Sequence, residues 1–195
     1  MKSQRKLAAA VAGALISTGF IGGCSVLPGG SPDPTINVDQ AVKQVDSILD
    51  DTVETVHPQL KWRDGPARRS ERRNPFTNKA NGEVNVGRYR YARTKVSKTK
   101  LPELLATITK HWSMEGFKTI ASNPREPSLS GNTKDGRFVK FSVSSFGDVE
   151  LYASVGALSS ESSGDIKGEE GDQFPQAPNG GPDYTPDMRD SYWSR

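Results

Sequence analysis

The sequence predicts an α+β domain, a mostly antiparallel sheet of four to five strands with two helices packed on one face. Three patterns support this fold class. Apolar residues recur at helical spacing over 38–56 and again over 101–112, and apolar and polar residues alternate over 137–158. Each segment has one apolar face, and a sheet that carries both helices on one side is the simplest arrangement that buries all three faces.

The first predicted helix begins after Asn37 and ends at or near His57, because Pro58 disfavours helical backbone in the residue before it. Asn37 and Gln40 have the spacing of a capping box, in which each side chain bonds the backbone N–H of the other residue. Charged residues alternate with the apolar stripe, so the helix is amphipathic. The members of the stripe are Val38, Val42, Val45, Leu49, Val53 and Val56.

The second predicted helix starts near Leu101 and has Pro102 in its first turn, where proline is tolerated. Gly116 is suited to the position just past its end, and Phe117 can pack back on the last turn. A short strand is expected over 117–122. The apolar face of this helix comprises Leu101, Leu104, Leu105, Ile108 and Trp112.

The clearest strands are 137–145 and 149–158, which form a hairpin through a tight turn, and a further strand is expected near 128–133. Over 83–97, another strand places Tyr89 and Tyr91 on one side and Arg88 and Arg90 on the other. A brief strand is expected around Leu60 and Trp62. The polar, arginine-rich segment 64–82 is interrupted by prolines and glycine, so we expect a long exposed loop.

These patterns divide the chain into a signal peptide over 1–23, a flexible tether over 24–36, the α+β domain over 37–158 and a tail over 159–195. The tether contains three prolines and two glycines without a continuous apolar pattern. The tail consists largely of serine, glycine, proline and acidic residues. Such a composition buries little apolar surface, so we expect the tail to be disordered.

The N-terminus has a positive segment ending at Lys6, an apolar run over 7–21 and the sequence Ile21-Gly22-Gly23-Cys24. This exit resembles the lipobox of bacterial lipoproteins. The resemblance implies that Cys24 receives a diacylglycerol, that the signal peptide is removed and that the protein is held on the extracytoplasmic face of the cell membrane. Two or three acyl chains anchor far more firmly than one. The alternatives are an ordinary secretory signal with a chance cysteine, or an uncleaved anchor.

In size and layout, the rest of the chain resembles small uncharacterised lipoproteins of high-GC Gram-positive bacteria, a resemblance that carries no catalytic residues. Cys24 is the single cysteine, so no intramolecular disulfide is expected. Three of the 26 basic residues lie in the segment to be removed, which leaves a mature chain with as many basic as acidic residues. The distribution of charge is therefore more informative than its sum.

Basic residues are concentrated between Lys61 and Lys100, where thirteen lysines and arginines accompany three acidic residues. We expect a basic patch that contacts anionic lipid, a cell-wall polymer or an envelope protein. The alternative is a solvated loop whose charge is balanced by the acidic tail. Nucleic acid is not expected as a partner, because the export signal separates it from the domain. The candidate contact residues are Arg68, Arg69, Arg72, Arg73, Arg88, Arg90 and Arg93.

Motifs for catalysis are weak. Ser97 and Lys100 match a Ser-x-x-Lys nucleophile motif, but Ser3 to Lys6 matches it too and the partner motifs are absent. His57 and His111 are the only histidines and form no pair at helical spacing, so we expect no metal and no cofactor. The predicted function is therefore a non-enzymatic, membrane-anchored binding protein. The alternatives are a small-ligand binder with a pocket between the sheet and the second helix and, least favoured, an enzyme.

Overall fold

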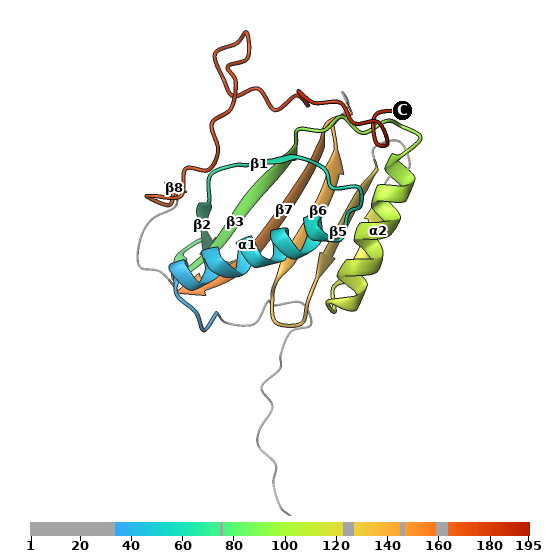
Figure 1. Cartoon of the computed structure of the whole chain (residues 1–195). Helices are drawn as coiled ribbons and strands as arrows, with labels where there is room; N and C mark the ends of the chain where they lie inside the picture. The colour runs from blue at the N-terminus through green and yellow to red at the C-terminus, as the bar shows by residue number, and fades with distance from the viewer. Residues whose placement is uncertain (1–33, 75, 123–126, 145–146, 159–163) are drawn as a thin grey trace, which may run out of the picture. The chain divides into compact units, whose positions relative to one another are not determined.

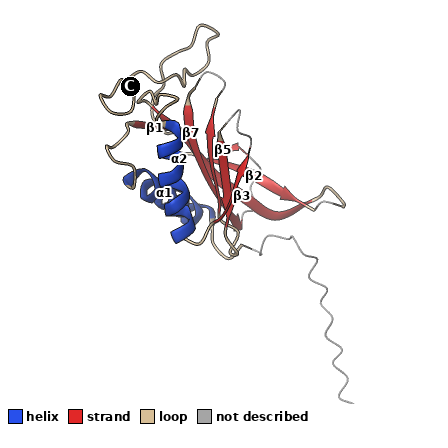
Figure 2. Cartoon of the chain, turned by 90° about the vertical axis from the view of Figure 1, so that its right-hand side faces the viewer, coloured by secondary structure: helices blue, strands red, loops and turns tan. Residues whose placement is uncertain are grey.

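The computed structural model describes residues 34–74, 76–122, 127–144, 147–158 and 164–195. It has the predicted α+β class: two helices lie on one face of an antiparallel sheet, and no helix of the described residues covers the other face (Figures 1 and 2). The predicted signal peptide, the lipobox with Cys24 and most of the tether lie outside the described residues. No helix in the described part combines the length and apolar character needed to span a membrane.

Helix α1 (Val38–Glu54) starts with the predicted capping box. The Asn37 side chain accepts from the Gln40 backbone N–H at 2.9 Å, and the Gln40 side chain accepts from the Asn37 N–H at 3.0 Å. The helix ends at Glu54, three residues before the predicted limit. Its apolar stripe faces the sheet, and the buried residues are Ala41, Val42, Val45, Ile48, Leu49 and Thr52.

Helix α2 (Leu101–Met114) also follows the predicted pattern, with Leu101, Leu104, Ile108 and Trp112 buried. Gly116 has a φ of +82°, a left-handed conformation that glycine adopts without strain and that ends the helix. The Phe117 backbone N–H then donates to the Trp112 carbonyl at 2.8 Å, which returns the chain to the sheet.

The described residues contain an eight-stranded sheet, where the sequence predicted four to five strands. Every strand pair is antiparallel, and the order along the sheet is β4-β5-β6-β7-β3-β2-β8, with β1 paired to β3. The predicted hairpin is confirmed as β6 and β7. The strands are β1 (Trp62–Asp64), β2 (Arg68–Arg73), β3 (Ala80–Ala92), β4 (Lys118–Ser122), β5 (Ser128–Asn132), β6 (Phe138–Val143), β7 (Val149–Leu158) and β8 (Gly164–Asp165).

The prediction of a long loop over 64–82 is wrong, because β1 ends and β2 lies within that segment. Strand β2 pairs with the first half of β3, and its register places Arg69 opposite Val86. The sequence RRSERR carries no apolar alternation, so its strand character comes from backbone pairing with a long neighbour and not from a buried face.

The prediction of a disordered tail is wrong for residues 164–195. Ile166 and Trp193 are buried, and Trp193 is only 1% exposed. The Trp193 indole N–H donates to the Pro58 carbonyl at 2.6 Å, and the Lys95 N–H donates to the Met188 carbonyl at 2.9 Å. A few apolar residues spaced along a polar segment are enough to dock it on an existing core, a long-range effect that local composition does not register.

The end of the predicted tether is also docked on the domain. The Leu158 N–H donates to the Ile36 carbonyl at 2.8 Å, and Asn37 forms a parallel bridge with Leu158. The start of the described chain is thereby fixed beside the end of β7, whereas residues 24–33 lie outside the described part.

Candidate functional site

The structure does not assemble the seven candidate arginines into one basic patch. Arg88 and Arg90 lie on the helix-covered side of β3, with side chains only 8% exposed. This placement follows from alternation, because Val84 and Val86 of the same strand point to the same side and are buried. The two arginines that were expected on the surface are therefore inside the domain.

Both buried arginines are neutralised by carboxylates from several elements. Arg88 contacts Asp46 of α1 at 2.8 Å and Glu169 of the C-terminal segment at 2.5 Å. Arg90 contacts Asp50 of α1 at 2.8 Å and binds Asp64 of β1 through two nitrogens. We call these six side chains the buried ion network.

The pKa values within the buried ion network reflect its partial burial. Loss of hydration raises the pKa of Asp46, and the Arg88 charge opposes that shift. Burial alone would lower the pKa of Arg90, but the hydrogen bonds and charges of Asp64 and Asp50 raise it overall. Arg90 therefore stays charged and is not available to an external anion.

The other candidate arginines are also paired with acidic side chains or otherwise engaged. Arg69 has a partner as well, and each of the other four forms an ion pair at the surface or, for Arg72, partly buried. Exposed ion pairs contribute little to stability, but each of the four pairs lowers the charge presented to an anionic surface. The pairs are Arg68–Asp165 at 3.0 Å, Arg72–Glu83 at 2.7 Å, Arg73–Glu71 at 2.6 Å and Arg93–Asp187 at 3.0 Å.

The structure gives Ser97 and Lys100 different partners. The Ser97 hydroxyl lies 2.9 Å from the Thr99 hydroxyl. The Lys100 ammonium lies 3.0 Å from Glu103 and 3.4 Å from the centre of the Tyr192 ring. The hydrogen bonds that the Lys100 ammonium makes to Tyr192 and Glu103 raise the pKa of Lys100, which keeps it protonated and unsuited to act as the base for a serine nucleophile.

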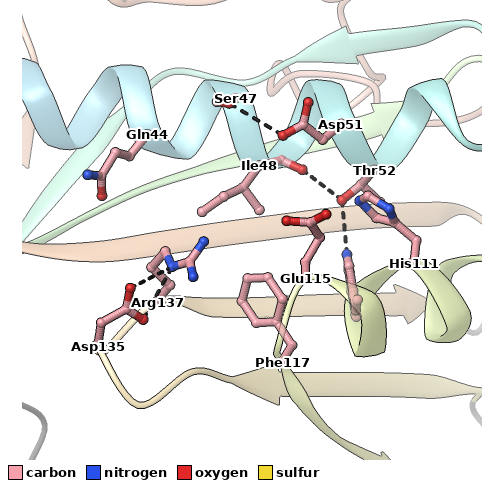
Figure 3. Close-up of a pocket in the computed structure, with 11 residues that line it drawn as sticks. Gln44, Ser47, Ile48, Asp51, Thr52, His111, Glu115, Phe117, Asp135 and Arg137 are labelled. Atoms are coloured by element: carbon pink, nitrogen blue, oxygen red, sulfur yellow. Dashed lines mark hydrogen bonds and ion pairs between the residues drawn. The ribbon is translucent and has the colours of Figure 1, made fainter.

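A cavity of about 310 Å³ lies between α1, α2 and the start of β6 (Figure 3). We call it the interhelical cleft. Its apolar lining includes Ile48 from α1 and Trp112 and Phe117 from the end of α2 and the residues that follow. All three are nearly buried, with Phe117 5% exposed. The sequence led us to expect a pocket between the sheet and the second helix. The interhelical cleft instead lies between the two helices, and no residue of the described strands belongs to its lining.

A hydrogen-bond chain fixes the two helices at the base of the interhelical cleft. Thr52 donates to the Ile48 carbonyl at 2.7 Å, and its hydroxyl oxygen accepts from the Trp112 indole N–H at 2.9 Å (Figure 3). Buried Thr52 thereby satisfies the indole donor of the second helix. The apolar floor is consequently preformed.

The rim of the interhelical cleft is polar and carries unbalanced negative charge. Asp51 from α1 and Glu115 at the end of α2 are exposed, and neither forms an ion pair among the described residues. Arg137 does not balance them, because it pairs with Asp135 at 3.0 Å and lies 5.4 Å from the centre of the Phe117 ring. The cleft thus joins an apolar floor to two carboxylates without cationic partners.

A second cavity of about 320 Å³ adjoins the interhelical cleft. The two cavities share Gln44, Asp135 and Arg137, so the Arg137–Asp135 pair stands between them. His111 lines the first cavity, but the described residues contain no group of three or more histidine, cysteine or acidic side chains able to hold a metal ion.

The rim residues were only partly accessible to sequence reasoning. Asp51 is one of the charged residues that alternate with the apolar stripe of the first helix, and it lies on the exposed face. Asp135 and Arg137 belong to a turn before β6, and no local signal places that turn opposite α1, which precedes it by more than 80 residues. No protein-family model, no curated protein and no solved structure matches the chain.

Proposed function

We propose that this chain is a non-enzymatic lipoprotein, anchored through Cys24 on the extracytoplasmic face of the cell membrane, that binds a small organic cation in the interhelical cleft. The observation that carries the ligand class is the pairing of a preformed apolar floor with two unbalanced carboxylates on the rim. A cavity of this volume falls within the range typical of small-molecule sites, about 300–1,000 Å³.

The charge of the cleft favours a cation over an anion. Asp51 and Glu115 supply attraction, while the one arginine of the rim is already bound to Asp135. The apolar floor favours a ligand with a hydrocarbon body beside its charged group. By contrast, the ion pairs of the candidate arginines give little support to an anionic surface as the partner, because their charge is compensated within the chain.

Three probes of the same size and different charge test this proposal. Benzylamine, benzyl alcohol and benzoate are each titrated into the full-length ¹⁵N-labelled chain, and the Trp112 indole N–H signal is followed by NMR. We expect benzylamine to shift this signal most and benzoate least, because only the amine gains from Asp51 and Glu115. Equal shifts from all three probes, or none from benzylamine, would overturn the proposal.

Matched variants assign the effect to the rim. Glu115→Gln and Asp51→Asn keep the size of each side chain and remove its charge, so both should weaken benzylamine binding. Glu54→Gln removes an exposed carboxylate from the same helix outside the cleft and should leave binding unchanged. If all three variants weakened binding alike, the attraction would come from the overall charge of the molecule and not from the cleft.

The anchor has its own test. In the lipoprotein proposal, Cys24→Ala removes the thiol that accepts the diacylglycerol. The expected result is that wild-type chain from membrane fractions carries a lipid mass on an N-terminal Cys24 peptide, and that the variant keeps its signal segment. An unmodified Cys24 in membrane-bound protein would contradict it.

A further inference from the structure

The helix-free face of the sheet carries a continuous row of aromatic rings. Ring centroids lie 6.1 Å apart for Phe138 and Tyr152, 4.5 Å for Tyr152 and Tyr89, and 6.0 Å for Tyr89 and Tyr91. Two rings of the C-terminal segment extend the row, since Tyr184 stacks on Tyr91 at 4.2 Å and contacts Phe174 at 5.1 Å. We call these six rings the aromatic row.

The aromatic row is accessible from outside. Tyr89 is 37% exposed and Tyr184 is 40% exposed, and both count among the most exposed large apolar side chains of the described residues. Gly87 leaves room for the Tyr152 ring, because a Cβ at this position would stand 2.4 Å from the Tyr152 hydroxyl. The phenol of Tyr152 therefore rests on the backbone of β3.

The side chains around the aromatic row are mostly small hydroxyl and amide groups. The strand registers place them on the same face as Tyr89 and Tyr152. Tyrosine, serine and asparagine together form an adaptable recognition surface, because rings supply contact area and the small groups supply hydrogen bonds. These neighbours are Asn85, Ser128, Ser130, Asn132, Ser142 and Ser154.

This face has little net charge. Lys140 and Glu150 offset each other formally, and Glu150 accepts from the Ser142 hydroxyl at 2.7 Å. Arg63, at the end of the row, is paired with Asp187 at 2.9 Å. Burial, followed by the nearby Glu150 carboxylate, raises the pKa of Tyr89, so its phenol remains neutral. An electrically neutral occupant suits the face better than a polyanion or an anionic membrane.

The size of the face favours a slender occupant. Four strands at about 4.8 Å spacing and about 3.4 Å per residue, over the length of β6, give roughly 400 Å². A stable protein partner typically covers about 800 Å² per side, roughly twice as much. The aromatic row itself is one ring wide, which suits a linear molecule with flat apolar faces.

We propose that the aromatic row is a binding site for a neutral glycan chain of β-linked pyranose units. Each pyranose ring presents C–H groups on its faces, which pack on aromatic rings, and hydroxyl groups on its edge, which bond to serine, asparagine and tyrosine side chains. The site lies on the opposite side of the sheet from the interhelical cleft and does not depend on the function proposed for the cleft.

Isothermal titration of the full-length chain with cellohexaose and hexa-N-acetylchitohexaose, two neutral β-linked hexasaccharides, tests this site. The protein is kept in a detergent without a sugar head group, because a glycoside detergent would compete. We expect saturable binding of at least one hexasaccharide. Tyr89→Ala should weaken that binding about fivefold or more, and Tyr152→Ala should act in the same direction. Tyr89→Phe keeps the ring and should bind nearly as well as wild type.

Two controls distinguish binding at the aromatic row from nonspecific binding. Phe76→Ala removes an aromatic ring that is 86% exposed and lies outside the row, so it should leave binding unchanged. Hexagalacturonate, a charged oligosaccharide, should bind more weakly than the neutral chains. The proposal is overturned if neither neutral hexasaccharide binds, if the two alanine variants of the row bind like wild type, or if the charged chain binds best. If neither neutral hexasaccharide bound, a protein would be the favoured partner of this face.

Discussion

The two sides of β3 show opposite relationships between residue type and burial. On the helix-covered side, Arg88 and Arg90 are 7% and 6% exposed and end in the buried ion network. On the helix-free side, Tyr89 is 37% exposed and belongs to the aromatic row. The two arginines of this strand thus lie on the inner side of the sheet, and its two tyrosines lie on the outer side.

Alternation along a strand separates two sets of side chains but does not determine which set faces the core. In β3, nearby carboxylates allow the side that carries the arginines to face the core. Asp46 and Asp50 lie one turn apart on α1, above the two arginines, so the helix carries its own counter-ions to the sheet. Four carboxylates around two guanidinium groups make burial of the arginines tolerable, because each charge keeps a partner.

The largest effect is expected from Arg90→Ala, which leaves Asp50 and Asp64 without their shared cation. Breaking a buried ion pair in this way should destabilise the fold by about 3 kcal/mol, whereas Tyr89→Ala on the next residue should cost about 1 kcal/mol or less. Urea denaturation followed by circular dichroism measures both. Equal costs for the two variants would show that the two sides of β3 do not differ as described.

A smaller effect is expected from Gly87→Ala, which adds a methyl group beneath the Tyr152 phenol. The ring has to move off the strand, and because its free end lies on the helix-free face, the cost should be about 1 kcal/mol. Gly156→Ala is the matched control, because its Cβ would meet its nearest neighbour at an ordinary 3.5 Å. If Gly87→Ala and Gly156→Ala unfolded at the same urea concentration, the Tyr152 ring would not pack on Gly87 as closely as described.

The smallest effect concerns acid release of the C-terminal segment. A hydrogen bond from Arg93 lowers the pKa of Asp187, and backbone N–H groups of Trp193 and Tyr192 lower the pKa of Asp190, from an ordinary value of 3.8. Because the pKa values of these two carboxyl groups are lowered in the folded chain, their charged forms stabilise the docked segment at any pH above 3.8. This stabilisation is lost as the pH falls below 3.8 and through the lowered pKa values. Asp46 behaves in the opposite sense, since its raised pKa means that protonation relieves a burial penalty.

Fluorine NMR of 5-fluorotryptophan-labelled protein can follow this release. Below a pH of about 4, the Trp193 signal should move toward that of exposed tryptophan while the Trp112 signal, from the core between the helices, stays in place. Simultaneous change of both signals would mean that the segment does not detach separately from the domain.

Much of the fold could be predicted because its determinants are local. The capping box of Asn37 and Gln40, the glycine at 116 and the alternation in the hairpin of β6 and β7 each act within a few residues. Strand β2 and the ordered C-terminal segment could not be predicted in this way. Strand β2 lacks an apolar pattern and depends on pairing with its neighbour β3. The C-terminal segment is held by partners far along the chain, as Trp193 is held by Pro58.

The sites were harder to predict than the elements that carry them. The sequence indicated a pocket beside the second helix, but the interhelical cleft also needs the turn at Asp135 and Arg137. The seven arginines were correctly recognised as concentrated in sequence. The ion-pair partners of these arginines were not recognised, because acidic residues from α1 and from the C-terminal segment reach the arginines only in the folded chain.

The burial of Arg88 and Arg90 is the claim on which the choice between a basic patch and other binding surfaces depends. Phenylglyoxal modification of the native full-length chain, read by peptide mass spectrometry, tests it directly. Arg68, whose side chain is 68% exposed, should react rapidly, while Arg88 and Arg90 should react only after denaturant is added. Modification of Arg88 and Arg90 in the native protein at the rate of Arg68 would contradict this account.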